Sequence, residues 1–188
     1  MIKKNLPIYD IIFDEETGVF QNVSLVDVPA IQRDFIQLSK QEMLQLKINE
    51  ENRIVSGPAL IPDQLVYRKD GNEEFYIRFS ADTIKKMALN FFHNGRQNEG
   101  NLMHCVPVND ITFFESYLIN KERGIAPVEF ADLPDGTWIL SAKINNDEVW
   151  ELVKNGTLNG FSISAKAGIE PEKKTLDTLQ DLLDYIKS

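Results

Sequence analysis

The sequence predicts an α+β fold, a mainly antiparallel β-barrel or sheet with helices packed around it. Short segments of alternating apolar and polar residues recur along the 188 residues, and turn-forming residues separate them. Few segments have helical periodicity, and strands do not alternate regularly with helices. This last observation argues against the parallel sheet of an α/β protein, in which a helix follows each strand.

Two turn signals predict hairpins. Asp70-Gly71 is the strongest of them and predicts that the strands on either side pair with each other. The run 107–110, which contains the turn-forming residues Pro107, Asn109 and Asp110, predicts a second hairpin. Residues 32–51 are polar and weakly periodic, so we expect a surface excursion there. In chain order, the predicted strands are 8–13, 19–28, 53–61, 65–68, 74–79, 101–106, 111–119, 136–144 and 158–168.

Two helices have clear limits in the sequence. Ser80 is a suitable N-cap for a helix that ends at Asn94-Gly95. Apolar residues recur within it at three- and four-residue spacing, which predicts one buried face. A shorter helix is expected over 148–154, after a cap at Asn146.

The C-terminal part differs from the rest of the chain. Residues 175–187 carry leucine and isoleucine on one stripe, which predicts an amphipathic helix. The charged run 170–174 contains a proline and is typical of a linker. We therefore expect one domain over 1–168, followed by a linker and a C-terminal helix over 169–188.

Composition excludes several classes of function. The formal net charge of -9 argues against nucleic-acid binding, which depends on clustered cations. The single cysteine, Cys105, excludes an intrachain disulfide and a cysteine-based zinc cluster. No apolar stretch is long enough to predict a membrane span, and neither glycine-rich nucleotide motif occurs. We expect a cytoplasmic protein without a metal or a nucleotide cofactor.

His104 is the first candidate for chemistry. If the predicted hairpin centres near Asn109-Asp110, His104 faces Glu115 across two strands, with the Cβ atoms about 5 Å apart. A carboxylate at that distance fixes the imidazole tautomer and leaves the other ring nitrogen free as a base. The alternative is a half-buried strand histidine with an incidental acidic neighbour.

Ser162 is the candidate nucleophile, in the sequence Gly160-Phe161-Ser162-Ile163-Ser164. The small glycine lets a substrate carbonyl approach, and the strand holds the hydroxyl rigidly. Any strand serine beside a glycine has these features, so a structural serine is the alternative. Ser164 lies on the same face of the strand and is a rival nucleophile.

Two further residues are weaker candidates. Cys105 follows His104 in a predicted strand, so their side chains point to opposite faces and do not pair. A buried structural thiol is the better interpretation, and a cysteine hydrolase that uses Cys105 stays an alternative. His93 ends the first helix, where a cation complements the helix dipole, which favours capping over catalysis.

Several segments together resemble a known family in their order and spacing. They are 23–30, 57–63, 79–80, Asn101-Leu102-Met103-His104, 114–119, 148–150 and Gly160-Phe161-Ser162-Ile163. The resemblance is to the phage prohead maturation proteases, serine peptidases with a herpesvirus-assemblin-like fold, and within them to the XkdF-like branch. It covers about residues 19–168.

By this resemblance, Ser162 is the nucleophile that attacks a peptide carbonyl, and His104 is its general base. Related proteases place a histidine or an acid as the third member of the catalytic group. We expect Glu115 there from the cross-strand geometry, with Glu170 and Asp177 as alternatives.

The chain departs from the commoner prohead pattern in one position. That pattern has a glycine two positions after the nucleophile, where this chain has Ser164. The difference bears on the backbone that forms the oxyanion hole. Main-chain N–H groups near Ala165-Lys166 are the candidate donors.

The resemblance also implies a place of action. It predicts a protease in the host cytoplasm, inside an assembling procapsid, that cleaves the scaffolding protein and extensions of the major capsid protein. A homodimer or higher homo-oligomer is expected. The alternative is a catalytically inactive relative that serves as an internal scaffold or capsid-interaction module, because a fold alone does not establish activity. In the protease, His104 and Ser162 must approach within hydrogen-bond distance.

Overall fold

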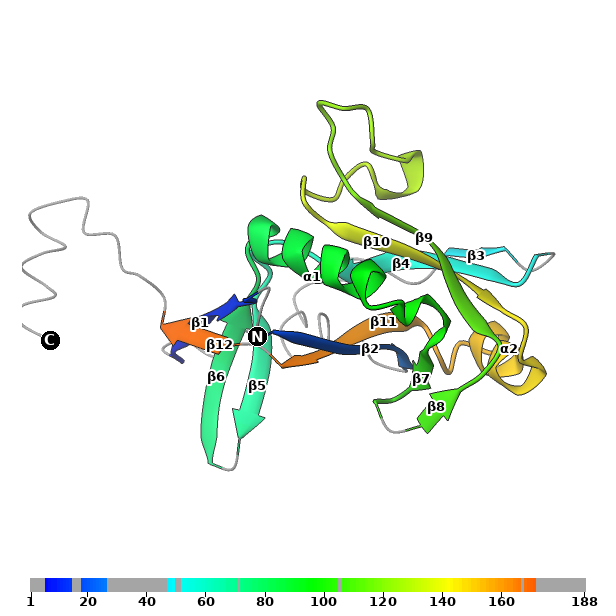
Figure 1. Cartoon of the computed structure of the whole chain (residues 1–188), viewed down its shortest axis with the longest axis horizontal. Helices are drawn as coiled ribbons and strands as arrows, with labels where there is room; N and C mark the ends of the chain where they lie inside the picture. The colour runs from blue at the N-terminus through cyan, green and yellow to red at the C-terminus, as the bar shows by residue number, and fades with distance from the viewer. Residues whose placement is uncertain are drawn as a thin grey trace, which may run out of the picture.

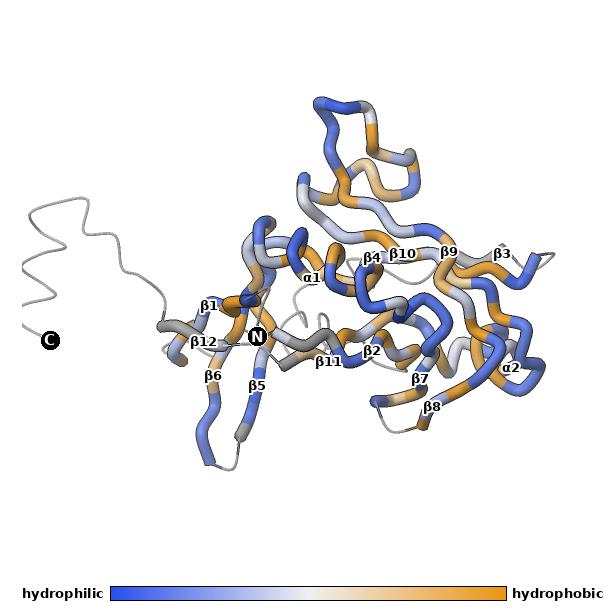
Figure 2. Tube along the Cα trace, in the orientation of Figure 1, coloured by the Kyte–Doolittle hydropathy of each residue, from blue (hydrophilic) through white to orange (hydrophobic). Residues whose placement is uncertain are grey.

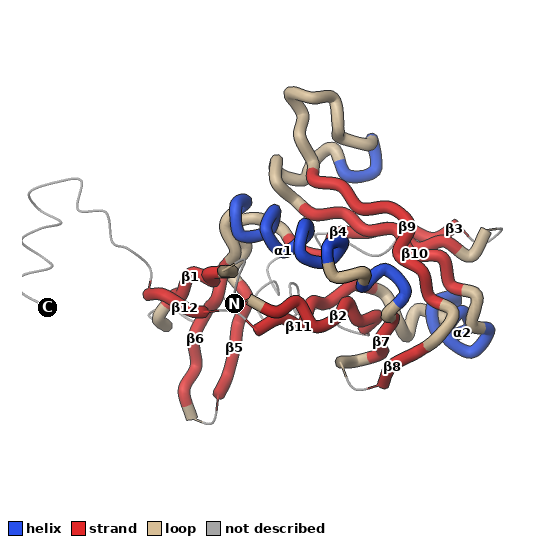
Figure 3. Tube along the Cα trace, viewed as in Figure 1, coloured by secondary structure: helices blue, strands red, loops and turns tan. Residues whose placement is uncertain are grey.

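A computed structural model describes residues 6–14, 18–26, 47–49, 52–70, 72–104, 106–166 and 168–171. These residues form three four-stranded sheets and two α-helices (Figures 1 and 3), which confirms the predicted α+β class. No helix in this part of the chain is long and apolar enough to span a bilayer.

Each sheet combines strands that are distant in sequence. The first has the order β12-β1-β6-β5, the second β3-β4-β10-β9 and the third β11-β2-β7-β8. All pairs are antiparallel except β1–β6 and β2–β7. The strands are β1 (Ile8–Ile12), β2 (Val19–Val26), β3 (Lys47–Asn49), β4 (Ile54–Leu60), β5 (Val66–Asp70), β6 (Glu73–Arg78), β7 (Gly100–Leu102), β8 (Val106–Val108), β9 (Ile111–Leu118), β10 (Trp138–Ile144), β11 (Gly160–Lys166) and β12 (Gly168–Pro171).

The described sheets are open. A barrel closes only when the two edge strands of a sheet pair with each other. Within the described ranges β8 and β11, the edges of the third sheet, do not pair. The mainly antiparallel sheet is therefore confirmed, and the predicted barrel is wrong for this part of the chain.

Both predicted helices with capping signals are confirmed. α1 (Ala81–His93) begins after Ser80, whose side chain accepts a hydrogen bond from the backbone N–H of Thr83 at 3.1 Å. α2 (Asp147–Lys154) begins after Asn146, which accepts from the backbone N–H of Val149 at 3.0 Å. Short 3₁₀ helices lie at η1 (Arg96–Asn98) and η2 (Val128–Phe130).

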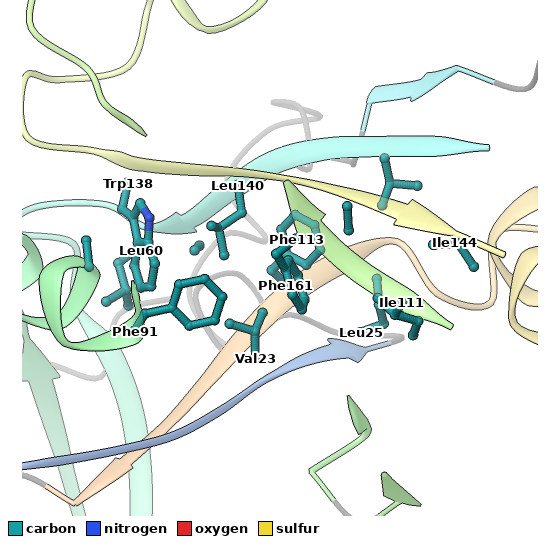
Figure 4. Packing of buried hydrophobic residues seen from close by; sticks show 14 of the residues in the cluster. Val23, Leu25, Leu60, Phe91, Ile111, Phe113, Trp138, Leu140, Ile144 and Phe161 are labelled. Carbon is teal, nitrogen blue, oxygen red and sulfur yellow. The ribbon is translucent and has the colours of Figure 1, made fainter. Parts of the chain in front are cut away.

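The main hydrophobic core lies between the second and third sheets, and α1 contributes its apolar face (Figure 4). Four aromatic rings from α1, β9, β10 and β11 meet edge to face. Phe91 lies 5.7 Å from both Phe113 and Trp138, and Phe113 lies 5.8 Å from Phe161, measured between ring centroids. Such pairs add about 0.5–1.5 kcal/mol each beyond area burial. Phe161 thereby anchors β11, the strand that carries Ser162.

The β5–β6 hairpin is hydrophilic at its outer end, whereas β9 and β10 carry both hydrophobic and hydrophilic residues (Figure 2). The hairpin was predicted by Asp70-Gly71 and is confirmed by the antiparallel pairing of β5 with β6. Every residue of β10 except Lys143 is buried, so both faces of this strand are covered.

The second predicted hairpin is wrong. The structure pairs β7 with β8, so that the chain turns between Leu102 and Val106. Strand β9 then enters the second sheet, where it pairs with β10. The polar turn at Asn109-Asp110 is real, and Asp110 has a positive φ of 63°. It changes the chain from one sheet to the other instead of closing a hairpin.

Two other predicted segments lie only partly within the described residues. The structure continues as strand β12 to Pro171, paired with β1, where the sequence indicated a linker from residue 170. The remaining linker and the predicted helix over 175–187 lie outside the described residues. Most of the predicted excursion at 32–51 also lies outside them, and its end forms β3.

Candidate active site

Three buried polar residues lie in a row across the third sheet. Ser162 on β11 is directly opposite Ser24 on β2, and Ser24 is opposite Asn101 on β7. Their exposed fractions are 3%, 0% and 8%. Buried polar groups need hydrogen-bond partners. This row is therefore a buried polar strip across the sheet.

His104 reaches this strip from the β7–β8 turn. Met103 and His104 both adopt left-handed backbone conformations, with φ of 53° and 59°. Such a conformation costs a residue with a side chain about 1–3 kcal/mol. Two hydrogen bonds to β2 hold the turn: the N–H of Met103 donates to the carbonyl of Leu25 at 3.1 Å, and the N–H of His104 donates to Ser24 Oγ at 3.2 Å.

The imidazole of His104 lies among three serine hydroxyls. Its Nε2 is 2.8 Å from Ser162 Oγ. Its Nδ1 is 2.7 Å from Ser164 Oγ and 3.0 Å from Ser24 Oγ. Both ring nitrogens are thus engaged, which fixes the orientation of the ring.

The surrounding partners fit one tautomer. Ser24 Oγ accepts the backbone N–H of His104 and lies 3.1 Å from two amide oxygens, Asn22 Oδ1 and Asn101 Oδ1, one of which takes its hydroxyl proton. Ser24 then accepts from Nδ1–H, as Ser164 does. With the proton on Nδ1, Nε2 has a free lone pair that accepts the hydroxyl proton of Ser162. This is the arrangement that a general base requires.

Comparison with known proteins places the chain in a family. The family described as "Putative phage serine protease XkdF" matches residues 42–170, which include both His104 and Ser162. The chain belongs to this family. The predicted XkdF-like membership is therefore confirmed.

Two proteins of Bacillus subtilis (strain 168) are similar to the chain. YqbD is 28% identical over 166 residues, which cover 81% of this chain and 46% of YqbD. The phage-like element PBSX protein XkdF is 27% identical over 164 residues, which cover 80% of this chain and 54% of XkdF. The chain thus spans about half the length of these curated relatives. No solved structure matches it significantly, so the assemblin-like fold stays a prediction.

The expected third member, Glu115, lies elsewhere in this XkdF-family chain. It is an exposed residue on β9, opposite Ser141 in the second sheet, and no hydrogen bond joins it to His104 in the described structure. The cross-strand argument for Glu115 was wrong because β9 pairs with β10 and not with β7. Hydroxyl groups of Ser24 and Ser164 occupy the Nδ1 side instead.

The environment keeps the imidazole neutral. Burial lowers the pKa of His104 from its ordinary value of 6.5, and the positive charge of Arg68 lowers it further. A neutral imidazole at neutral pH can accept a proton. Both effects therefore support the base form of His104.

The other candidates separate clearly. Ser164 shares the face of Ser162, as predicted, but contacts the opposite ring nitrogen. His93 lies at the exposed end of α1, where the helix dipole favours a cation. Cys105 and Asp177 lie outside the described residues. Glu170 lies on β12, where its backbone is paired with Asp10.

The backbone near the predicted oxyanion donors is irregular. The pairing of β11 with β2 shifts register between Ser164 and Ala165, as at a β-bulge or a similar irregularity. Bulges re-aim groups beside active sites. The assignment of the oxyanion donors near Ala165-Lys166 stays a prediction. In the described ranges no group of three or more metal-ligating side chains occurs.

Sequence reasoning missed the roles of Ser24 and Asn101. Ser24 contacts the ring and the backbone of His104, and Asn101 contacts Ser24. A serine in a strand carries no signal of its own. The signal that could have found them is the alignment of Ser162, Ser24 and Asn101 on three neighbouring strands. This alignment is visible only when the strand register is known.

Proposed function

We propose that this chain is a serine endopeptidase, with Ser162 as nucleophile and His104 as general base. The observation that carries the proposal is the distance of 2.8 Å between His104 Nε2 and Ser162 Oγ. It lies within the range required for proton transfer. Membership in a family described as a phage serine protease supports the same chemistry.

In the proposed reaction, Ser162 Oγ attacks the carbonyl carbon of a peptide bond while His104 Nε2 takes the hydroxyl proton. The tetrahedral intermediate collapses, the protonated imidazole donates to the leaving amine, and an acyl-enzyme forms. Water then attacks the ester with His104 again as the base. Ser162 is regenerated, and the net reaction consumes one water for each peptide bond.

The Nδ1 side stabilises the imidazolium that forms during attack. Ser24 and Ser164 supply neutral oxygen acceptors for Nδ1–H at 3.0 and 2.7 Å. A carboxylate makes a stronger hydrogen bond to imidazolium than a hydroxyl does. We therefore infer a moderately active enzyme whose base is positioned by two serines.

The proposed biological role follows from the resemblance and the family name. We propose that the enzyme acts inside an assembling phage procapsid in the host cytoplasm, on the scaffolding protein and the major capsid protein, as a homo-oligomer with an assemblin-like fold. The phage origin in the family description supports this setting. In this setting the peptidase would act at one stage of capsid assembly.

The test uses the cognate capsid and scaffolding proteins. The purified chain and its Ser162→Ala variant are incubated with them, and the fragments are measured by mass spectrometry. We expect defined fragments with the unaltered chain and none with the variant. Equal cleavage by both would refute the assignment of Ser162, and intact substrates in both reactions would favour the inactive scaffold module.

A further inference from the structure

A second site lies beside the serine–histidine pair. A pocket of about 290 Å³ opens between the first and third sheets, against α1. Its volume is near the low end of the range for ligand pockets and leaves room for a peptide side chain. It is lined by Ile11, Gln21, Arg68, Ile77, Phe79, Met87, Ile163, Ser164 and Ala165.

The pocket touches the catalytic group through Ser164. The Oγ of Ser164 lies 2.7 Å from His104 Nδ1, and Ser162 is two residues earlier on the same strand. Two residues of a strand span about 7 Å. A side chain in the pocket therefore belongs to a substrate residue at or near the bond that Ser162 attacks.

The pocket has a mixed lining, with six apolar and three polar residues. Gln21 and Ser164 are neutral, and Arg68 on β5 is the one charged side chain among the lining residues. The guanidinium of Arg68 is close enough to lower the pKa of His104. The pocket thus combines apolar contacts and neutral polar groups with a single cation.

Arg68 has no carboxylate partner in the described structure. Its hydrogen bond is from Nη1 to the backbone carbonyl of Tyr67 at 2.9 Å, which leaves four of its five N–H donors for another acceptor. Burial lowers the pKa of Arg68, a sign that its charge is partly desolvated. A desolvated charge is costly unless an anion compensates it.

Arg78, on the adjacent strand β6, provides the contrast. Its Nε and Nη2 donate to the two carboxylate oxygens of Asp10 at 2.6 and 3.3 Å. Asp10 is therefore already engaged by another arginine. Among the described residues, Arg78 is paired with a carboxylate, whereas Arg68 lines the pocket without one.

We propose that this pocket is a substrate subsite that binds an acidic side chain, glutamate above all, with the carboxylate on Arg68. Glutamate fits because two methylene groups lie along the apolar wall while its carboxylate makes a bidentate contact with the guanidinium. The inference deepens the proposed peptidase function and rests on it.

The test reads cleavage positions and binding separately. A proteome-derived peptide library is incubated with the unaltered chain, Arg68→Gln and Lys69→Gln, and the new termini are sequenced by mass spectrometry. Lys69→Gln is the matched control, because it removes an exposed charge from the next position of β5. In parallel, the Ser162→Ala chain, with and without Arg68→Gln, is titrated with N-acetylglutamate amide and N-acetylglutamine amide and followed by NMR.

We expect glutamate to be enriched about tenfold or more at one fixed position from the cleaved bond, since a charged hydrogen bond contributes about 1.5–3 kcal/mol. Arg68→Gln abolishes the enrichment, and Lys69→Gln keeps it. Cleavage without acidic preference overturns the subsite and leaves the peptidase standing.

The binding arm separates the remaining outcomes. Glutamate binding that exceeds glutamine binding and depends on Arg68, without cleavage by any variant, supports the pocket and refutes the peptidase. Neither cleavage nor preferential binding overturns both.

Discussion

Two sheets of this chain each contain a pair of serines in directly opposed positions. Ser56 and Ser141 face each other across β4 and β10, and Ser24 and Ser162 across β2 and β11. In the first pair the two hydroxyl oxygens are 2.7 Å apart and bond to each other. In the second pair each hydroxyl bonds instead to a different nitrogen of His104.

The comparison shows what makes a strand serine chemically competent. Register and residue type are the same in the two pairs, so neither explains the difference. The cause is the β7–β8 turn, which places an imidazole between the second pair by means of two consecutive left-handed residues. Backbone strain at this turn is compensated by hydrogen bonds to β2, as is common at functional sites.

The largest expected effect is the loss of peptide hydrolysis in Ser162→Ala, which the corresponding substitution in the other serine pair should not cause. Ser162→Ala should lower peptide hydrolysis by about 10⁴-fold or more, because the nucleophile and base act as one unit. Ser141→Ala should leave the hydrolysis rate unchanged and lower the free energy of unfolding by about 1 kcal/mol, through the lost hydroxyl pair. Kinetics and urea denaturation measure the two quantities. A comparable loss of activity in both variants would contradict the distinction.

The second prediction concerns the base. Ser24→Ala removes an acceptor from Nδ1 and the acceptor of the His104 backbone N–H. We expect kcat to fall about 10- to 100-fold with little change in KM. The pH midpoint of activity should also fall, because the imidazolium loses a partner. Ser56→Ala is the matched control. An unchanged pH midpoint in Ser24→Ala would show that Ser24 has a structural role only.

The third prediction is the pH dependence of the unaltered chain. The neutral imidazole is the active form, so activity rises with pH. Burial and then Arg68 lower the pKa of His104, which puts half-maximal kcat/KM below pH 6.5. In Arg68→Gln the midpoint should move upward, toward 6.5. A midpoint above 6.5 in the unaltered chain contradicts the described environment.

The smallest effect is expected at Glu115. Its side chain is exposed on β9 and makes no hydrogen bond to His104 in the described structure. Glu115→Gln should therefore change kcat/KM by less than about twofold, as surface substitutions away from a site usually do. A loss comparable to that of Ser24→Ala would restore Glu115 as the third member.

Local signals in the sequence predicted much of the fold. The caps at Ser80 and Asn146 and the hairpin at Asp70-Gly71 depend on neighbouring residues, and all three are observed. The β7–β8 hairpin was missed because its turn carries Met103 and His104 in a conformation that glycine or asparagine usually supplies.

The candidate site was predictable only in part. Resemblance to a family pointed to Ser162 and His104, whose contact the sequence alone cannot establish because they are 58 positions apart. Glu115 was favoured through the wrong hairpin register. Ser24 was missed because its importance depends on the pairing of β2 with both β11 and β7, which no local pattern reveals.

Covalent labelling with a fluorophosphonate probe tests the activation of Ser162 by His104 most directly, because it needs no knowledge of the substrate. The labelled residue is located by peptide mass spectrometry in the unaltered chain, His104→Ala and Ser164→Ala. We expect an adduct on Ser162 in the unaltered chain, little or none in His104→Ala, and retained Ser162 labelling in Ser164→Ala. Labelling of Ser164 in place of Ser162, or equal labelling without His104, would contradict the assignment of Ser162 as the activated nucleophile.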